Sequence, residues 1–589
     1  MVRIAVLDRW KCRPKNCDYL CIKVCPRVRM GDETITIDEA KKKPIIIEEL
    51  CAGCGICVNK CPFNALTITN LPEEHGVLTH QYGKNSFRLY GLPVPKKGSI
   101  VGIIGVNGIG KSTAINILAG NLKPNLGEYE KEPEWDEVIE SYRGNEVQEY
   151  LTGLKEGQTK AVLKPQYVDM IPESMKGSVN ALLDKLSGER DVDGLVKTFG
   201  MGSCVENDID KLSGGELQRL AIIAAMAKDS DIYLFDEPTS YLDISQRLLV
   251  AKTIRHLAAE GKAVLVIEHD LIVLDYLSDY IHLTYGVKGA YGIISQIKSS
   301  RVGINEYLQG QMKNENVRIR SDAIQFDGRA TGVIKSKDLL TEYPNIDKAF
   351  EHFSLSVNNG DLYNSEVVGV VGPNATGKTT FVKVLAGELE NDGKKLDTGL
   401  SVSYKPQYIK PVDKTVREVL SSVTNKLYKS GYKREILEPF ELEDLLERNL
   451  KDMSGGEVQR VAVAECLSRD ADIYLMDEPS AYLDIEQRLV AAKAIRRFME
   501  EKKKAALIVD HDIAFVDYIS DKLMVFAGKP GIEGKASGTL EMEKGMNEFL
   551  GGMKVTFRRD EDSNRPKANK PGSQKDKEQK KSGKYYYNC

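Results

Sequence analysis

The chain has 589 residues, of which 42% are hydrophobic and 29% are charged, a composition typical of a globular protein. Its length suggests about four domains. No apolar run approaches the ~18 residues that a membrane-spanning helix needs, and residues 1–30 lack the apolar core of a secretory signal. These features argue against an integral membrane or extracellular protein, so we expect a cytoplasmic one.

The net charge of −4 is an average over unlike parts of the chain. Basic residues outnumber acidic ones over residues 1–30 and again over residues 555–589, whereas the body between them is acidic. Two basic ends predict contact with a polyanion, although a solvated charge run is the commoner explanation. Residues 555–589 also contain few apolar residues, which predicts a basic tail with little order.

Cysteines are concentrated at the N-terminal end, over residues 12–61. One run follows the bacterial ferredoxin spacing C-x-x-C-x-x-C-x-x-x-C-P, and the run before it is a stretched version of the same pattern. In two-cluster ferredoxins the fourth cysteine of each run ligates the other cluster. The spacing therefore predicts two 4Fe–4S clusters, one on Cys12, Cys17, Cys21 and Cys61 and the other on Cys25, Cys51, Cys54 and Cys57.

Zinc is the alternative ligand for these cysteines, but structural zinc sites favour separated C-x-x-C pairs. We expect residues 1–75 to form an α+β, ferredoxin-like domain. Nothing nearby in the sequence indicates a flavin or another electron partner, so a structural or mechanical role for the clusters is favoured over a redox role.

The rest of the chain repeats itself at long range. GVNGIGKS at residues 105–112 recurs as GPNATGKT at 372–379, and KPQY, SGGE and DEP each recur in the same order. The Gln of KPQY precedes the Ser of SGGE by 47 residues in both copies. This register predicts a duplicated α/β domain, with copies at residues 76–300 and 326–554 and a polar hinge at 301–325.

One interval differs between the copies. The segment between the glycine-rich loop and KPQY is 26 residues longer in the first copy. Apolar residues at helical spacing on both sides of Asn145, a predicted N-cap with Gln148 at the capping-box position, predict a helix–loop–helix insertion at about 132–157. A neutral surface insertion is the alternative, but the asymmetry between otherwise matched copies favours a functional one.

Each glycine-rich loop follows an apolar strand and precedes a helical run, which is the context of a Walker A motif. Backbone N–H groups of such a loop face the phosphates of a nucleotide at the start of the helix. The predicted ATP-binding residues are Gly105, Asn107, Gly108, Gly110, Lys111, Ser112 and Thr113 in the first copy, and Gly372, Asn374, Gly377, Lys378, Thr379 and Thr380 in the second.

Carboxylates that end apolar strands complete the predicted catalytic chemistry. The candidate Mg²⁺ ligands are Ser112, Gln166 and Asp236 in one copy and Thr379, Gln407 and Asp477 in the other. Glu237 and Glu478 are placed to accept the proton of an attacking water. His269 and His511 each follow a further strand in register and are predicted to sense the γ-phosphate.

The SGGE motif is a second predicted anion site, because a serine and two glycines open a helix there. The pattern resembles the ATP-binding-cassette superfamily, in which two cassettes close head-to-tail around two nucleotides. The resemblance implies that Ser454 and Gly456 complete the site of Lys111, while Ser213 and Gly215 complete that of Lys378. The usual final Gln of this signature is Glu in both copies.

The adenine-stacking residues are less sharply indicated. Tyr82 and Phe87 precede the first glycine-rich loop, and Tyr343 and Phe353 precede the second. Aromatic rings there stack on a base or pack in the core, and the sequence leaves both interpretations open.

The cysteine runs, two cassettes and no apolar spanning segment together resemble the E subfamily of ATP-binding-cassette proteins, the RNase L inhibitors that recycle ribosomes. The resemblance covers nearly the whole chain. It implies an ATPase, acting as a monomer, that splits ribosomes with a release factor or a Pelota-type protein and stays on the small subunit, with initiation factors as further partners. It also implies that the insertion and Arg301, Arg318 and Arg320 of the hinge contact ribosomal RNA.

Two other classes remain open. One is an iron–sulfur assembly or redox ATPase, and the other is a detached transporter motor, against which the fused cysteine domain argues. For the favoured function, binding of two ATP molecules closes the cassettes and hydrolysis reopens them.

Overall fold

The computed structural model describes residues 2–8, 11–38, 42–63, 65–71, 77–186, 190–320, 323–326, 338–391 and 399–586. It divides into two compact units, one made of Met1–Tyr241, Leu249–His269 and Leu277–Asp322, and the other of Leu242–Leu248, Asp270–Tyr276 and Ala323–Cys589. The domain boundary expected at residues 75 and 76 and hinge residues 321 and 322 lie outside the described residues.

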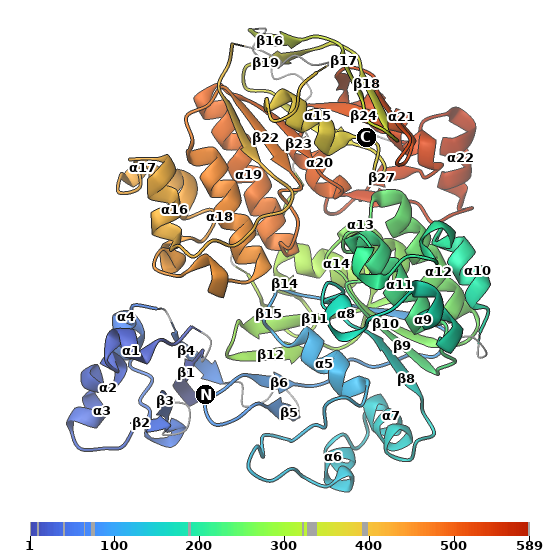
Figure 1. Ribbon diagram of the computed structural model, residues 1–589. Coiled ribbons are helices and arrows are strands. Elements are labelled where there is room, and N and C mark those ends of the chain that lie inside the picture. Colours follow the sequence, from blue (N-terminus) through green and yellow to red (C-terminus); the bar gives the residue numbers. More distant parts are fainter. Residues whose placement is uncertain are drawn as a thin grey trace. The chain divides into compact units, whose positions relative to one another are not determined.

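The cysteine-rich domain is small and is built on two antiparallel pairs of strands (Figure 1). Strand β1 (Val2–Leu7) pairs with β4 (Leu66–Leu71), and β2 (Ile35–Asp38) pairs with β3 (Lys43–Ile46). Four short helices complete the domain and carry three of its cysteines: α1 (Pro14–Cys17), α2 (Leu20–Val24), α3 (Pro26–Arg29) and α4 (Ile56–Lys60). This is the α+β domain that the sequence predicts.

Two side chains of the first cassette hold strand β1 and the loop beside it. The Asn85 amide accepts from Leu7 N at 2.9 Å and donates to Ala5 O at 2.9 Å, so it continues the backbone pairing of β1. The Arg88 guanidinium donates to both oxygens of Glu48 at 2.6 Å. The cysteine-rich domain is therefore docked on the first cassette by directed polar contacts.

The first cassette is built on a nine-stranded sheet in the order β5-β6-β12-β11-β7-β10-β9-β8, with β13 paired to β11. Four of its strands run parallel to one another, and the three that lie inside the sheet are buried along their whole length, as their apolar sequences require. The four are β7 (Ile100–Ile104), β8 (Ala161–Lys164), β9 (Ile232–Asp236) and β10 (Ala263–Ile267). The outer strands are β5 (Leu78–Gln81), β6 (Arg88–Tyr90), β11 (Tyr280–Val287), β12 (Tyr291–Ile294) and β13 (Lys298–Ser299).

Helices of this cassette follow the strands that carry the motifs. They include α5 (Lys111–Leu118), α9 (Val179–Leu186), α10 (Val192–Thr198), α11 (Gly214–Met226), α12 (Ile244–Ala259) and α13 (Leu271–Leu277). The first-copy insertion forms α6 (Trp135–Ser141) and α7 (Glu146–Lys155), with Asn145 capping α7 through Val147 N and Gln148 accepting from Gly144 N. The predicted helix–loop–helix is thus present in the structure.

The first part of the expected hinge is a helix. Residues Ser300–Gln309 form α14, which packs on β11 with Ile304, Tyr307 and Leu308 buried. After it, β14 (Gln311–Met312) pairs with β15 (Val317–Arg318). The segment is polar in composition, so the sequence did not indicate that most of this helix is buried.

The second cassette repeats the sheet of the first. Its order is β17-β18-β25-β24-β20-β23-β22-β21, with β26 paired to β24. The strands are β17 (Ile346–Ala349), β18 (Ser354–Val357), β20 (Val367–Val371), β21 (Val402–Lys405), β22 (Ile473–Asp477), β23 (Ala505–Val509), β24 (Lys522–Lys529), β25 (Glu533–Ala536) and β26 (Leu540–Glu541). A separate pair joins β16 (Leu339–Tyr343) to β19 (Gly360–Tyr363).

The main helices of the second unit also match those of the first. They are α15 (Lys378–Leu385), α16 (Val416–Val423), α18 (Gly455–Ser468), α19 (Ile485–Lys502), α20 (Ile513–Ile519) and α21 (Met542–Met553). The duplicated α/β architecture predicted from the motif intervals is therefore correct.

The prediction of a poorly ordered tail is wrong for the part that the structure describes. Residues Phe557–Arg559 (β27) pair with Pro566–Ala568 (β28), and Gln574–Ser582 form α22. The segment is held largely by buried polar side chains, such as Asp576, which accepts from the Thr556 hydroxyl at 2.7 Å. A composition poor in apolar residues does not reveal a fold of this kind.

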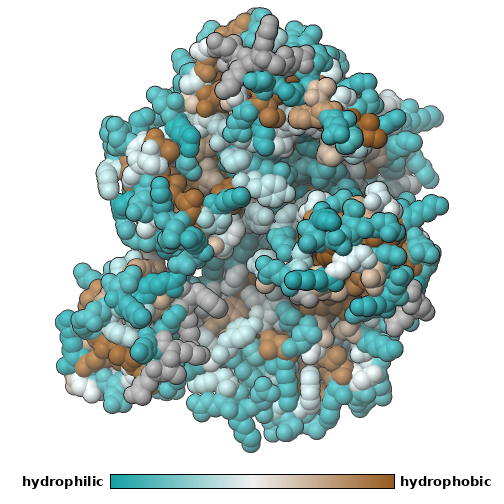
Figure 2. Space-filling model, viewed as in Figure 1, coloured by the Kyte–Doolittle hydropathy of each residue, from teal (hydrophilic) through white to brown (hydrophobic). Residues whose placement is uncertain are grey.

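Among the described residues, no helix is both long enough and apolar enough to cross a membrane. The face drawn in Figure 2 is mostly hydrophilic, and its hydrophobic side chains gather in small separate patches.

Candidate functional site

Each glycine-rich loop connects a buried strand to the N-terminus of a helix. Between β7 and α5, the Lys111 ammonium donates to Gly105 O at 2.7 Å, to Val106 O at 2.8 Å and to Asn107 Oδ1 at 3.3 Å. Gly110 has a φ of 90°, and a Cβ there would lie 2.7 Å from the Phe87 ring. Only glycine fits this position, so the loop can wrap closely around its own lysine.

The second loop repeats this geometry between β20 and α15. The Lys378 ammonium donates to Gly372 O at 2.9 Å and to Pro373 O at 2.6 Å. Burial lowers the pKa of Lys378 to about 8, against the opposing effect of nearby carboxylates. In both loops the lysine is held over the concave face that the motif offers to phosphate groups.

Two of the three predicted magnesium ligands meet beside each loop, while Gln166 and Gln407 bond the neighbouring glutamates instead. Ser112 hydrogen-bonds Asp236, and the Thr379 hydroxyl donates to Asp477 Oδ2 at 2.7 Å. Burial raises the pKa of both aspartates above the ordinary range. A hydroxyl and a carboxylate converging in this way are oxygen donors of the type that Mg²⁺ prefers, so the residues fit that ion.

In the first copy, Glu237 lies close to two other predicted site residues and to one serine of its own motif. Gln166 Nε2 donates to Glu237 Oε1 at 2.6 Å, and His269 Nε2 lies 3.5 Å from the same oxygen. The Ser240 hydroxyl donates to Glu237 Oε2 at 3.1 Å. Residues from two other motifs, and a serine of the glutamate's own motif, therefore converge on one carboxylate.

The second copy shows the same convergence. Gln407 Nε2 donates to Glu478 Oε1 at 2.8 Å, and His511 Nε2 lies 3.4 Å from that oxygen. Burial by itself raises the pKa of Glu478, but the hydrogen bond and charge of His511 outweigh it and leave the pKa below its ordinary value. Glu478 is therefore an ionised carboxylate at neutral pH, as a general base must be.

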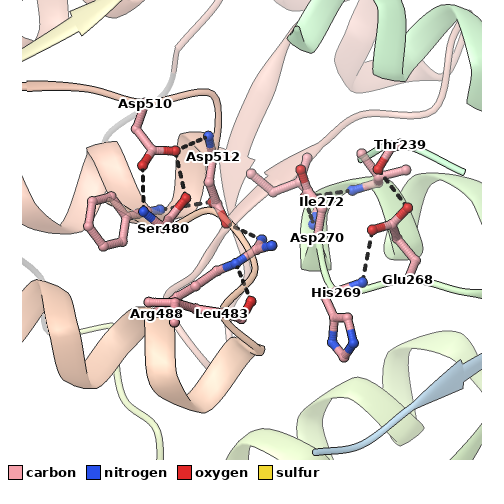
Figure 3. Close-up of polar contacts among 12 residues, drawn as sticks. Thr239, Glu268, His269, Asp270, Ile272, Ser480, Leu483, Arg488, Asp510 and Asp512 are labelled. Atoms are coloured by element: carbon pink, nitrogen blue, oxygen red, sulfur yellow. Dashed lines mark hydrogen bonds and ion pairs between the residues drawn. The ribbon is translucent and has the colours of Figure 1, made fainter. Parts of the chain in front are cut away.

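Figure 3 shows how each histidine turn is fixed. In the first copy, the Glu268 carboxylate accepts from the Thr239 hydroxyl at 2.6 Å and from His269 N at 2.8 Å. In the second, Asp510 accepts from the Ser480 hydroxyl at 2.7 Å and from Asp512 N at 2.9 Å. These acidic residues tie the histidine turn to the segment after the predicted base, Glu237 or Glu478, and sequence reasoning assigned them no role.

A lysine and a glutamine on the far side of the glutamate were also missed. Lys164 and Gln218 donate to the Glu237 carbonyl, and Lys405 and Gln459 do the same for Glu478. All four side chains are buried. The repeated KPQY motif and the Gln that follows SGGE in both copies could have identified them.

The two signature turns differ in one partner. The Ser213 hydroxyl donates to Glu216 Oε2 at 2.7 Å, and the Ser454 hydroxyl donates to Glu457 Oε2 at 2.9 Å, so the unusual Glu caps its own helix. The other oxygen of Glu216 accepts from the Cys204 thiol at 3.1 Å. The corresponding oxygen of Glu457 accepts from the Arg448 guanidinium at 2.8 Å instead.

One predicted aromatic residue must be replaced. Tyr343 is only 1% exposed and packs against Phe381, so it belongs to the core and not to an adenine site. By strand register the counterpart of Tyr82 is Phe350, which is 45% exposed. The sequence identifies Tyr343 as an aromatic residue ahead of the second glycine-rich loop, but it does not show which strand places its ring beside that loop.

The other three aromatic residues lie beside the loops. Tyr82 is 56% exposed, and its hydroxyl is 3.0 Å from the Thr113 hydroxyl. Phe87 lies beneath Gly110, and Phe353 lies beneath Gly377 in the same way. The first copy thus presents Tyr82 and Phe87 next to its loop, and the second presents Phe350 and Phe353.

The eight N-terminal cysteines fall into two groups in space. One cavity of about 150 Å³ is lined by Cys25, Cys51, Cys54 and Cys57. A second, smaller pocket is lined by Cys12, Cys17, Cys21 and Cys61. These are the two sets that the ferredoxin spacing predicts, including the exchange of the fourth cysteine between runs.

Half of these eight cysteines are buried, and among the others Cys54 is exposed. Burial raises the pKa of Cys12 to about 11, that of Cys57 to about 11 and that of Cys21 to about 12. Thiols in such surroundings are inert unless a metal centre stabilises the thiolate. Four converging sulfurs around a cavity are a donor set that fits an iron–sulfur cluster.

The residues implicated in RNA contact have mixed surroundings. Arg143, at the turn between α6 and α7, is exposed. Arg320 donates to the carbonyls of Tyr307 and Leu308 at 2.6 Å and 2.9 Å, so it caps α14. Arg301 and Arg318 are exposed on the same segment.

Family models match three parts of the chain. The ABC transporter model matches residues 95–240 and 355–481, the 4Fe-4S binding domain matches residues 44–67, and a possible Fer4-like domain in RNase L inhibitor matches residues 2–33. The two cassettes and both cysteine runs are therefore each recognised separately.

Known proteins match the chain over its whole length. An uncharacterised ABC transporter ATP-binding protein of Methanocaldococcus jannaschii is 52% identical over 100% of this chain and 98% of its own length. Translation initiation factor RLI1 of Saccharomyces cerevisiae is 45% identical over 99% and 98%. Among solved structures, a model of ribosome-bound archaeal Pelota and ABCE1 contains a chain that matches with a TM-score of 0.94 at 53% identity, over 100% of this chain and 99% of that one. The chain belongs to the E family of ATP-binding-cassette ATPases, the family of the RNase L inhibitors.

Proposed function

We propose that this ATPase splits ribosomes into subunits together with a release factor or a Pelota-type protein, and then stays on the small subunit. The observation that carries the proposal is the end-to-end similarity to a chain solved on a ribosome with Pelota. A second similar structure is a complex of archaeal ribosomal stalk protein aP1 with archaeal ribosome recycling factor aABCE1. The relatives named as translation initiation factors support continued association with the small subunit.

The two ATP sites are composite in this proposal. Lys111 binds a nucleotide that Ser454 and Gly456 complete, and Lys378 binds one that Ser213 and Gly215 complete. Each signature turn opens a helix of more than twelve residues, so its N-terminal dipole favours an anion. The turn of one cassette has no phosphate of its own to bind, which is the reason for pairing it with the other cassette.

Hydrolysis needs positioning and a base more than covalent chemistry. Glu237 and Glu478 accept the proton of the attacking water, while Gln166 and Gln407 orient it. Bound Mg²⁺ would supply charge stabilisation to the phosphates, held through Ser112, Asp236, Thr379 and Asp477. His269 and His511, each within 3.5 Å of the base, are placed to contact the γ-phosphate.

The cysteine-rich domain is proposed to hold two 4Fe–4S clusters. Cys25, Cys51, Cys54 and Cys57 hold one, and Cys12, Cys17, Cys21 and Cys61 hold the other. Each set of four cysteines lines a pocket of its own, which supports two separate clusters. We expect iron and acid-labile sulfide analysis of anaerobically purified protein to give about eight of each per chain; stoichiometric zinc with little iron would refute the cluster assignment.

The insertion and Arg301 and Arg318 are proposed to contact ribosomal RNA. Arg143 is the one arginine of the insertion and is exposed at its turn, where its charge can bind a phosphate. Arg320 is less available, because it already caps α14.

Replacing Glu237 and Glu478 by Gln tests the function. The variant keeps the shape of the site but lacks the base, so it should bind ATP, lose hydrolysis by a factor of about 10² or more and accumulate on small subunits. The measurement is ATPase rate together with co-sedimentation with small subunits, with and without ATP. Lys160→Met, a change of an exposed lysine, serves as the control. A variant that loses hydrolysis and still sediments free of subunits with ATP present would refute the ribosomal function.

An iron–sulfur redox or assembly ATPase is the competing function. It predicts transfer of electrons or iron to a partner, and ATP turnover that does not respond to ribosomes. The same sedimentation assay separates the two, because only the ribosomal function predicts ATP-dependent retention on small subunits.

A further inference from the structure

The proposed bases share an uncommon backbone conformation. Glu237 has a φ of 47° and Glu478 a φ of 48°, in the left-handed region that residues with a Cβ rarely occupy. Each is followed by proline, Pro238 or Pro479, which restricts the preceding residue further. Such conformations persist only where the surroundings over-determine them, and they gather at functional sites.

The contacts that fix this conformation in the first copy involve both sides of the residue. Glu237 N donates to Ile267 O at 3.0 Å. Its carbonyl accepts from Gln218 Nε2 at 2.7 Å and from Lys164 Nζ at 3.3 Å, and the same ammonium donates to Asp236 O at 3.1 Å. The peptide that carries the base is thus held by one strand, one helix and one buried cation.

The second copy has the same arrangement at other residues. Glu478 N donates to Val509 O at 2.7 Å, and its carbonyl accepts from Gln459 Nε2 at 2.6 Å and from Lys405 Nζ at 3.1 Å. Lys405 Nζ also donates to Asp477 O at 2.7 Å. Two copies that differ at many positions keep the same two side-chain donors and the same backbone bond, which argues against a packing accident.

Burial shows that these side chains act on the carbonyl and not on solvent. Lys164 and Gln218 are 0% exposed, and Lys405 and Gln459 are 1% exposed. A buried ammonium costs free energy unless several acceptors surround it. Two successive carbonyls and the neighbouring carboxylates meet that need, and no neutral side chain could bridge both carbonyls with charge-assisted bonds.

We propose that Lys164 and Gln218, and their counterparts Lys405 and Gln459, are positioning residues that hold the catalytic glutamate in its left-handed conformation and so aim its carboxylate at the attacking water. The inference rests on the proposed role of Glu237 and Glu478 as bases. Without either donor the peptide relaxes, and the carboxylate leaves the geometry needed for proton transfer, while the loop that binds phosphate is untouched.

The test is a set of variants made in both cassettes of the full-length protein. Lys164→Met with Lys405→Met removes the ammonium but keeps a similar length, and Gln218→Met with Gln459→Met removes the amide. We expect the single-turnover rate of ATP hydrolysis to fall about ten- to a hundredfold in each, because misplacement of a reacting group by about 1 Å has effects of this size. The ATP dissociation constant should change less than about twofold.

Non-additivity distinguishes positioning from general damage. Both donors act on one carbonyl, so the four-fold variant should hydrolyse ATP at about the rate of the slower pair, whereas independent defects would multiply. Thermal unfolding identifies any variant that fails to fold, and the methionine substitution at the glutamines keeps the test available if the lysine variants are unstable.

The outcomes distinguish a failure of the positioning role from a failure of the proposed role of Glu237 and Glu478 as bases. Lys160→Met, on the same strand edge but exposed, should hydrolyse ATP at the wild-type rate. If Glu237→Gln with Glu478→Gln is inactive and the lysine and glutamine variants retain the wild-type rate, the positioning role is wrong. If the glutamate variant itself retains the wild-type rate, the assignment of the bases fails. A parallel loss of ATP affinity and hydrolysis would likewise overturn the positioning role.

Discussion

A buried histidine of the first cassette shows how one side chain couples stability to pH. His282, on β11, is 1% exposed; its Nε2 accepts from Val94 N at 3.1 Å, and its Nδ1 lies 2.7 Å from Ser295 O. Only the neutral tautomer with a proton on Nδ1 satisfies both bonds, because the protonated ring has no acceptor. Burial accordingly lowers the pKa of His282 to about 4.

This residue predicts a loss of stability in mild acid. The folded-state pKa lies below the unfolded value of ~6.5, so between these values the unfolded chain binds the proton and the folded one does not. We expect His282 to contribute about 3 kcal/mol to the fall in the free energy of unfolding as pH drops from ~6.5 to about 4. His282→Met is the matched variant, since β24 carries Met524 at the same register position. Denaturant unfolding at several pH values should give a shallower pH dependence for the variant; equal slopes would contradict the prediction.

Residue types and spacing were sufficient to predict most of the site. Lys111, Asp236, Glu237 and His269 come together as their motifs indicate, because each motif carries its own strand or turn. Lys164 was missed because its partners are backbone carbonyls, and only its recurrence in the second KPQY motif pointed to it. Tyr343 was misassigned because register, and not residue type, decides which ring lies beside the loop.

At the scale of elements, the insertion is part of the core and not an appendage. Val138, Tyr142, Val147 and Leu151 are buried in one hydrophobic cluster with the strands of the first cassette. The Tyr142 hydroxyl is 2.5 Å from the Thr79 hydroxyl on β5. Helices α6 and α7 are therefore fixed relative to the sheet, so their connecting turn is presented rigidly.

Truncating this contact should destabilise the first cassette. Leu151→Ala removes a fully buried side chain and leaves a cavity, which costs about 2–5 kcal/mol. Glu149→Ala on the same helix is exposed and should change stability by less than about 0.5 kcal/mol. Calorimetry of the two variants gives the comparison. Similar melting curves for both would mean that the insertion is not packed as described.

Helices and strands were predicted correctly where apolar residues recur at regular spacing. They were missed where buried polar side chains hold the element in place. The helices of the insertion were predicted from spacing alone. By contrast, α14 and the hairpin β27–β28 lie in polar segments, and the tail is held by contacts such as Arg559 with Asp517 and Thr556 with Asp576. Buried hydrogen-bond networks depend on three-dimensional partners, and no one-dimensional pattern announces them.

At the scale of the whole molecule, duplication governs the design. The two nine-stranded sheets have the same strand order, and the carboxylate–glutamine–histidine geometry recurs to within a few tenths of an ångström. The differences are local: an insertion in one copy, and Cys204 in place of Arg448 beside the signature glutamate. The motif intervals predicted this architecture, because a conserved register of several motifs requires a conserved scaffold.

Helix α11 carries residues that belong to both proposed ATP sites. Its first turn carries the signature serine, Ser213, and about one turn later Gln218 grips the carbonyl of Glu237. In the composite sites proposed above, that serine would contact one nucleotide and that glutamate would act on the other. The proposal therefore predicts that occupancy of one site affects turnover at the other, so that the hydrolysis rate rises cooperatively with ATP concentration.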